Sequence, residues 1–204
     1  MPDFALETAL GGCVVGIDEV GRGPLAGPVI AAAVRLDPTL CYDGLDDSKR
    51  LTAKRREALA ARLHETALIG LGRAEVAEID HLNILQATFL AMRRAFDALA
   101  LRLDAPIDHA LIDGPHCPKL PCQAHPVVGG DGRSLSIAAA SVVAKVHRDA
   151  LMAALALEYP GFGWERNAGY GTAAHLDALN RQGPTPHHRR SFAPVARLCG
   201  GEST

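Results

Sequence analysis

Three acidic residues stand where apolar, strand-like segments end. Asp18 and Glu19 directly follow the apolar run 13–17, and Asp113 follows the run 110–112. Ionised carboxylates beside a core destabilise the fold unless a cation or a donor compensates them. No His or Cys accompanies these acids, and Mg²⁺ and Mn²⁺ prefer carboxylate oxygens, so the pattern predicts a magnesium or manganese site rather than zinc. Taken singly, each acid is more often a turn or helix-cap residue than a metal ligand.

A glycine-rich segment after the first two acids could bind phosphate. Arg22 lies between Gly21 and Gly23. Glycines let a ligand approach the main chain closely, and a guanidinium offers phosphate a planar fork of donors. A lone Gly-Arg-Gly is a weak signal. Beside two carboxylates it places anion-binding donors next to a metal site, as phosphodiester chemistry requires.

Apolar periodicity predicts the elements that must position these residues. Strands are expected at 13–17, 27–36, 67–72, 109–112 and 126–128, the first two as a hairpin. Helices are expected at 53–66 with Thr52 as N-cap, 83–103, 134–159, 172–182 and 191–198, with a loop at 163–171 and a loose tail at 198–204. A mixed β-sheet covered by helices, of α/β or α+β class, follows.

Further motifs occur in order along the chain. They are residues 16–28, 47–49, 111–114, 130–131, 138–149, 169–172 and 188–192. Together they resemble the ribonuclease HII family from residue 16 to about 195. The resemblance implies one ribonuclease H-like catalytic domain over 1–204, with the sheet and its helices over about 12–160 and a C-terminal helical, substrate-binding portion over 161–198.

The resemblance also implies an activity and a site. The family hydrolyses the RNA strand of RNA–DNA hybrids and single ribonucleotides embedded in duplex DNA, with Mg²⁺ or Mn²⁺. Its four active-site carboxylates, which bind a pair of metal ions, would be Asp18, Glu19, Asp113 and Asp131. Gly21, Arg22 and Gly23 would contact the ribose 2′-OH and the neighbouring phosphate, and Tyr170 would detect the step from ribonucleotide to deoxyribonucleotide. Gly129 stands where relatives often have Lys, which would remove one backbone contact and leave the metal site intact.

Two-metal hydrolysis needs a carboxylate shared by both ions and leaves 5′-phosphate and 3′-hydroxyl ends. Asp18 is the expected bridging ligand because it ends the central strand, with Glu19 and Asp113 as further ligands and Asp131 as the outer one. Successive strand residues point to opposite faces, so Asp18 and Glu19 converge only if the chain turns between them. The nearby glycines favour such a turn.

Basic residues gather in two segments that are either solvated surface or the walls of a nucleic-acid groove. They are Lys49, Arg50, Lys54, Arg55, Arg56 and Arg62, and then Arg181, His187, His188, Arg189 and Arg190. Lys145 and Arg148 lie three residues apart and share a helix face. We predict that Lys49, Lys145 and Arg148 contact phosphates.

Other chemistries remain open at this point. His187 and His188 could act as an acid–base pair, leaving a 2′,3′-cyclic phosphate. A loop containing His116, Cys117, Cys122 and His125 could hold zinc or simply carry free thiols. The chain could also be another metal-dependent phosphoryl hydrolase, such as a DNA resolvase or a phosphatase, or a silent hybrid-binding module, although retention of all four acids disfavours the latter. The related ribonuclease HIII family has an added N-terminal domain, for which the residues before the first strand leave no space.

Composition limits where such an activity would operate. The 204 residues carry a net charge of −2, so any nucleic-acid contact must be local. No apolar run reaches the roughly 18 residues of a membrane helix, and the acidic N-terminus does not resemble a secretory signal. Five cysteines argue against a disulfide framework. A cytoplasmic monomer that binds nucleic acid and no membrane is expected.

Overall fold

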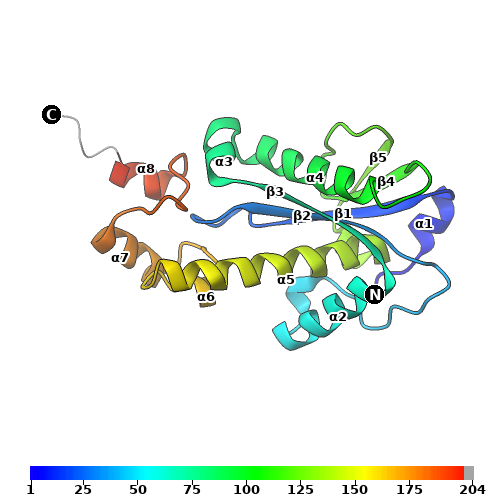
Figure 1. The fold of residues 1–204 in the computed structure, drawn as a ribbon, viewed down its shortest axis with the longest axis horizontal. Coiled ribbons are helices and arrows are strands. Elements are labelled where there is room, and N and C mark those ends of the chain that lie inside the picture. The colour runs from blue at the N-terminus through cyan, green and yellow to red at the C-terminus, as the bar shows by residue number, and fades with distance from the viewer. Residues whose placement is uncertain (200–204) are drawn as a thin grey trace.

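The computed structural model describes residues 1–199 and has a central sheet of five strands (Figure 1). In spatial order the strands are β3 (Leu68–Ala74), β2 (Val29–Arg35), β1 (Val14–Val20), β4 (His109–Asp113) and β5 (Gln123–Val127). The β3–β2 and β2–β1 pairs are antiparallel, whereas β1–β4 and β4–β5 are parallel. This mixed sheet confirms the predicted fold class.

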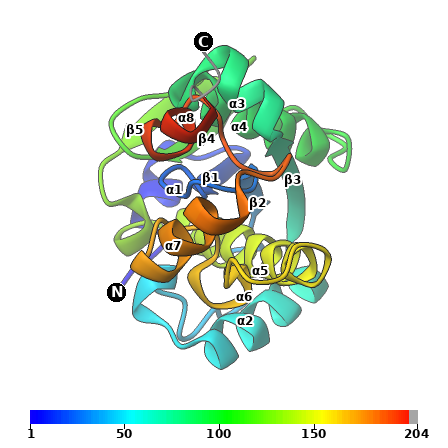
Figure 2. The same ribbon diagram turned by 90° about the vertical axis from the view of Figure 1, so that its left-hand side faces the viewer.

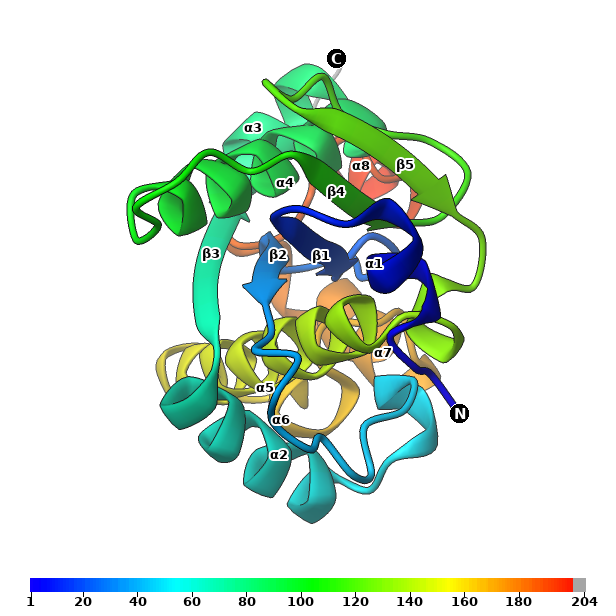
Figure 3. The same ribbon diagram turned by 90° about the vertical axis from the view of Figure 1, so that its right-hand side faces the viewer.

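Helices cover both faces of the sheet (Figures 1 and 3). On one face lie α3 (Val76–Leu82) and α4 (Ile84–Ala100), and on the other lie α2 (Ala53–Thr66) and α5 (Leu135–Glu158). The short helix α1 (Ala5–Leu10) lies near the start of β1. The C-terminal helices α6 (Trp164–Asn167), α7 (Ala173–Gln182) and α8 (Ala193–Cys199) gather at the other end of the molecule, where β1 runs into β2 (Figure 2).

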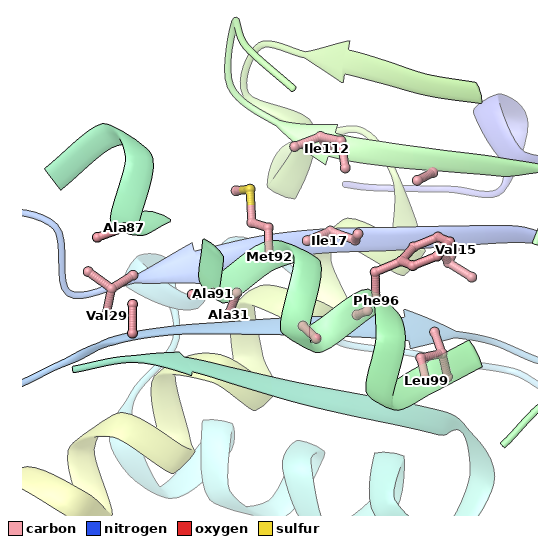
Figure 4. Close-up of a cluster of buried hydrophobic side chains, with 14 of the residues drawn as sticks. Val15, Ile17, Val29, Ala31, Ala87, Ala91, Met92, Phe96, Leu99 and Ile112 are labelled. Atoms are coloured by element: carbon pink, nitrogen blue, oxygen red, sulfur yellow. The ribbon is translucent and has the colours of Figure 1, made fainter. Parts of the chain in front are cut away.

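Apolar residues that recur at the predicted helical period on α4 form the core on that face of the sheet. Met92, Phe96 and Leu99 are buried against Ile17 of β1 and Ile112 of β4 (Figure 4). Burial of such side chains contributes about 1.5–3 kcal/mol each. This packing fixes β1 and β4 side by side, with Ile17 paired to Ile112. The carboxyl ends of these two strands therefore meet at one edge of the sheet.

Helix α5 packs directly on the backbone of β1. A Cβ atom at Gly16 would lie only 2.1 Å from the carbonyl carbon of Ser136, so the close approach requires glycine at this position. Val142 and Val143 of α5 join Ile30 and Val34 of β2 in a second core on this face. The first turn of α5 therefore lies over Gly16, two residues before Asp18.

A third, smaller core joins the C-terminal helices to the loop between β1 and β2. Its buried residues are Leu25, Ala26, Met152, Phe162, Trp164, Ala178, Leu179 and Val195. They come from the 21–28 loop, α5 and the segment 162–195. The loop that carries Gly21, Arg22 and Gly23 is therefore packed against the C-terminal portion of the chain.

Several element boundaries differ from the sequence predictions. Strand β1 extends to Val20 and includes both acids, while α1 and α3 were not expected and α6 lies within the predicted 163–171 loop. Thr52 caps α2 as predicted, accepting from the N–H of Arg55. Of the predicted tail, Leu198 and Cys199 belong to α8, and 200–204 lie outside the described residues. No helix within 1–199 is long and apolar enough to cross a membrane.

Candidate active site

Three of the predicted acids meet at the carboxyl edge of the sheet. Asp18 lies in β1, Asp113 ends β4, and Asp131 lies in the short 3-10 turn Gly130–Gly132 before α5. One carboxylate oxygen of each lies within 4.8 Å of the others. The Gly130 N–H donates to Oδ1 of Asp113 at 2.7 Å, which ties the Asp131 turn to the end of β4. With glycine at position 129, the three acids still come together.

Glu19 does not belong to this three-acid group. No turn separates it from Asp18, because both pair with β2, Asp18 opposite Ala32 and Glu19 opposite Ala31. The expected turn is therefore wrong, and strand alternation sends the two side chains to opposite faces. The Ser141 side chain of α5 partly opposes the rise in the pKa of Asp18, whereas Glu19 lines a pocket on the α4 side. A role of Glu19 as metal ligand stays a prediction.

Asp113 lies between the two faces and interacts with both neighbours. It shares the pocket on the α4 side with Glu19, Arg22 and Phe89, and it belongs to the group formed with Asp18 and Asp131. Its charge raises the pKa of both Asp18 and Glu19. The predicted set of four acids thus forms a close group of three, with Glu19 next to Asp113 on the other face.

Burial and mutual repulsion make the acids costly to ionise. Burial is the largest cause that raises the pKa of Asp18 well above its ordinary value, and the charges of Glu19 and Asp113 raise it further. Burial also raises the pKa of Glu19, against the opposing charge of Arg22. The pKa of Asp131 is raised by burial and by the charge of Asp113. These carboxylates carry more negative charge than the surrounding side chains neutralise.

Lys49 is the cation nearest to Asp131. Its Nζ lies 3.3 Å from Oδ2 of Asp131 and 3.6 Å from Oδ1 of Asp47. Partial burial opposes the charged form, but the carboxylates of Asp131 and Asp47 outweigh it and raise the pKa of Lys49. The side chain is 75% exposed, so this pair is weak in water. One mobile ammonium leaves the group open to divalent cations, and its all-oxygen donor set fits Mg²⁺ or Mn²⁺.

The turn carrying Lys49 is held from beneath. Ser141 of α5 donates to the Ser48 hydroxyl at 2.7 Å, and Arg56 donates to the carbonyls of Ser48 and Leu51. Sequence reasoning missed these supporting residues because Ser48 and Ser141, 93 positions apart, are brought together only by the fold.

The predicted sugar-reading residues lie side by side. A Cβ on Gly23 would be 3.3 Å from Cε1 of Tyr170, whose side chain is exposed. Arg22 lies beside Glu19, with Nη1 3.4 Å from Oε1. Gly21 has φ +95°, and a Cβ there would lie 2.2 Å from Nε of Arg148. Glycine at position 21 is therefore required by the backbone and by the arginine beneath it.

Two expected phosphate contacts have other surroundings. Arg148 is fully buried and donates to the carbonyls of Ala26, Pro28 and Ala168, so the prediction that it contacts phosphate is wrong. Lys145 pairs with Asp149 at 2.7 Å and lines a cavity beside α2 and α6. Its contact with phosphate stays a prediction.

The C-terminal basic segment is also partly internal. His188 and Arg189 are buried, and Nδ1 of His188 accepts from the Thr185 N–H at 3.0 Å while Nε2 lies 3.1 Å from Nε2 of His175. Both ring nitrogens are thus occupied inside the protein. The structure contradicts the alternative that His187 and His188 form an acid–base pair at the reaction centre.

The zinc alternative is not supported either. Within 1–199, the only group of three or more potential ligands is the three-acid group. Nε2 of His125 instead lies 3.2 Å from Nδ1 of His109. Burial raises the pKa of both Cys117 and Cys122, so these free thiols favour the protonated form.

The mixed five-stranded sheet gathers three carboxylates from β1, β4 and the turn before α5, and this donor set suits a metal-dependent nuclease. The ribonuclease HII family model matches residues 15–195. The chain is 66% identical over 201 residues to ribonuclease HII of Paramagnetospirillum magneticum, covering 97% of this chain and 98% of the relative, and 63% identical over 202 residues to that of Rhodospirillum rubrum, covering 96% and 90%. The chain belongs to the ribonuclease HII family.

Solved structures show the same fold. Ribonuclease H2 of Pyrococcus horikoshii OT3 superimposes with a TM-score of 0.72 at 23% identity, covering 92% of this chain and 97% of that one. Bst ribonuclease HIII in complex with Mn²⁺ has a TM-score of 0.76 at 19% identity, covering 98% of this chain and 73% of that one. The predicted ribonuclease H-like architecture is confirmed by these likenesses.

Proposed function

We propose that this ribonuclease H hydrolyses the RNA strand of RNA–DNA hybrids and also cuts at single ribonucleotides embedded in duplex DNA. The observation that carries the proposal is the close group of Asp18, Asp113 and Asp131, of which Asp18 and Asp131 are buried. A loop suited to reading a sugar hydroxyl lies next to it, with Gly23 against Tyr170. Such an activity belongs to ribonucleotide removal during DNA replication and repair, in the cytoplasm of the cell.

Two divalent ions, Mg²⁺ or Mn²⁺, would be held by the three-acid group together with Glu19. When bound, the ions supply an activated water and stabilise charge on the departing oxygen. Asp18 is the proposed shared ligand because it is buried and the charges of both Glu19 and Asp113 act on it. The Gly130 N–H orients the Asp113 carboxylate at 2.7 Å, so this chain positions its ligands before any ion arrives.

Substrate recognition would use donors beside the acids. Arg22 and the backbone of Gly21 and Gly23 would bind the phosphate and the ribose 2′-OH, and Tyr170 would pack on the following sugar. Lys49 would bind a further phosphate from its exposed position next to Asp131. A phosphatase or a DNA resolvase has no use for a reader of the 2′-OH, the group that distinguishes RNA from DNA.

The deciding experiment uses three labelled duplexes of one sequence: all DNA, DNA with one ribonucleotide, and an RNA–DNA hybrid. Each is incubated with Mg²⁺, Mn²⁺ or EDTA. Expected are cleavage of the two ribonucleotide-containing duplexes only, dependence on metal, and 5′-phosphate and 3′-hydroxyl ends. Equal cleavage of the all-DNA duplex, metal-independent cleavage or a 2′,3′-cyclic phosphate would refute the proposal. Light scattering during gel filtration tests the expected monomer.

A further inference from the structure

Two buried arginines lie beneath the loop 21–28. Arg189 donates to the carbonyl oxygens of Gly21, Arg22 and Gly27, the last at 2.8 and 2.9 Å. Arg148 donates to the carbonyls of Ala26 and Pro28, each at 3.0 Å. Five carbonyl oxygens of one short loop thus point inward, toward two guanidinium groups that are both fully buried.

Neither guanidinium has a carboxylate partner. None of the ion pairs formed within residues 1–199 includes Arg148 or Arg189. Asp80, which acts on Arg189 at longer range, is instead hydrogen-bonded to Arg190 and Ser191. Burial lowers the pKa of Arg148 to about 10 and that of Arg189 to about 9, so both remain charged at neutral pH.

The buried guanidinium groups and the carbonyls of the loop depend on one another. A buried charge without a counter-ion is costly unless hydrogen bonds compensate it. The carbonyl dipoles of the loop replace the water that the guanidinium groups lose. In return, the arginines fix the orientation of the loop's peptide groups.

That orientation determines which groups the loop presents outward. In a trans peptide the C=O of one residue and the N–H of the next point in opposite directions. Because Arg189 holds the carbonyls of Gly21 and Arg22 inward, the N–H groups of Arg22 and Gly23 point away from it. Successive N–H groups of this kind form a concave site for an anion or another acceptor.

The same contacts place Tyr170 beside the loop. Arg148 also donates to the carbonyl of Ala168 at 2.8 Å, and the carbonyl of Gly169 accepts from the N–H of Leu25 at 2.8 Å. Gly169 directly precedes Tyr170 in the chain. Arg148 therefore links the position of Tyr170 to that of the 21–28 loop.

We propose that Arg148 and Arg189 are positioning residues for ribonucleotide recognition: they hold the carbonyls of the 21–28 loop inward so that the N–H groups of Arg22 and Gly23 face the ribose and phosphate beside Tyr170. This inference rests on the proposed function. It assigns the arginines to recognition through the loop, with no contact between them and the nucleic acid.

The test compares Arg189→Lys, which keeps the charge and loses the planar fork, with Arg102→Lys. Arg102 is a control away from the site: it is an exposed arginine just beyond the C-terminal end of α4 and donates to the carbonyl of Ile69 at 2.8 Å. The N-terminal part of α4, by contrast, lines the pocket of Glu19. Binding is measured by fluorescence anisotropy in Ca²⁺, with duplex DNA containing one ribonucleotide and the same duplex without it. Mn²⁺ affinity is measured by calorimetry.

We expect Arg189→Lys to lower the preference for the ribonucleotide duplex at least tenfold and to raise KM, while Mn²⁺ affinity changes less than twofold. A merely structural role would lower the active fraction and leave both the preference and KM unchanged. Arg102→Lys should match the wild type. If Arg189→Lys does not fold, Arg148→Lys is judged by the same criteria.

An unchanged preference in a folded variant would overturn the inference. So would an equal loss of affinity for both duplexes. Failure of the proposed function is a separate result, because the wild-type protein would then neither prefer nor cleave the ribonucleotide duplex.

Discussion

Replacing Asp18 by Asn should stabilise the metal-free protein while abolishing its metal site. Asp18 is buried, and its carboxylate lies within 4.8 Å of those of Asp113 and Asp131. The amide is isosteric, and its oxygen can still accept from the Glu19 N–H, as Oδ1 of Asp18 does at 2.7 Å. The substitution therefore removes a charge and changes little else in the packing.

The magnitude follows from the spacing of the charges. At an effective dielectric of about 20, two unit charges about 5 Å apart repel by roughly 3 kcal/mol. Asp18 relieves part of this repulsion by taking up a proton, because its pKa is raised. We expect a gain of about 2 kcal/mol in the free energy of unfolding at pH 8, or roughly 4–8 °C in Tm for a chain of this size.

The pH dependence has a definite sign. A carboxyl group with a raised pKa in the folded state favours folding most at low pH. Its contribution is lost as pH rises from about 4, where the unfolded chain ionises, through the raised pKa of Asp18. The advantage of Asp18→Asn over the wild type should thus grow with pH in EDTA.

Thermal unfolding in EDTA and in Mn²⁺ tests these expectations. Mn²⁺ at 100 times its Kd should stabilise the wild type by about 2.7 kcal/mol and leave Asp18→Asn nearly unchanged, with cleavage reduced at least about 1000-fold. Asp97→Asn, at an exposed acid of α4, is the control and should behave as the wild type. A lower Tm for Asp18→Asn than for the wild type in EDTA would refute the electrostatic reasoning.

Three further predictions concern the surroundings of the site. Lys49→Glu should weaken binding of an RNA–DNA hybrid about tenfold and reduce the slope of log K against log salt by about one. An unchanged slope in a salt titration would show that Lys49 does not contact a phosphate. Glu7→Gln should lower the free energy of unfolding by about 1–3 kcal/mol, because the Glu7 carboxylate accepts from the Ser136 N–H and hydroxyl at the N-terminus of α5. Urea titrations measure the change, and a variant as stable as the wild type would contradict the prediction. Burial lowers the pKa of His188 to about 4, so its contribution to stability is present above about pH 6.5 and is lost as pH falls toward 4. Between pH 7 and 5 the free energy of unfolding should therefore fall by about 2 kcal/mol more for the wild type than for His188→Gln. Equal falls for the two proteins would show that His188 is not buried as a neutral ring.

The sequence predicted the strand-end acids well and the geometry between them poorly. Asp18 and Asp113 were found from apolar runs that end in carboxylates. Asp131 lies in a short turn without periodicity, so only the family resemblance could indicate it. The separation of Glu19 from Asp18 was missed because the apolar run stops at residue 17, while backbone pairing with Ala31 and Ala32 continues β1 further.

Buried charges and short helices escaped prediction for different reasons. Arg148 and Arg189 were expected near the surface, since charges usually stay in water, and their carbonyl partners in the 21–28 loop lie more than 100 residues away in the chain. Helix α3 did leave a local signal, because Glu75 and Glu78 form a capping box. Weighing that box would have placed a second helix before Asn83.

The attachment of the 21–28 loop to Arg148 and Arg189 has a consequence for biosynthesis. At about 5–20 residues per second, several seconds separate the emergence of this loop from the ribosome and the addition of residue 189. Until then the carbonyls of Gly21, Arg22 and Gly27 lack their arginine donor, and the N–H groups of Leu25 and Gly27 lack their backbone partners at 169 and 187 for part of that time. A nascent chain thus contains Asp18, Asp113 and Asp131 before it contains Arg189, the residue that holds the carbonyls of Gly21, Arg22 and Gly27.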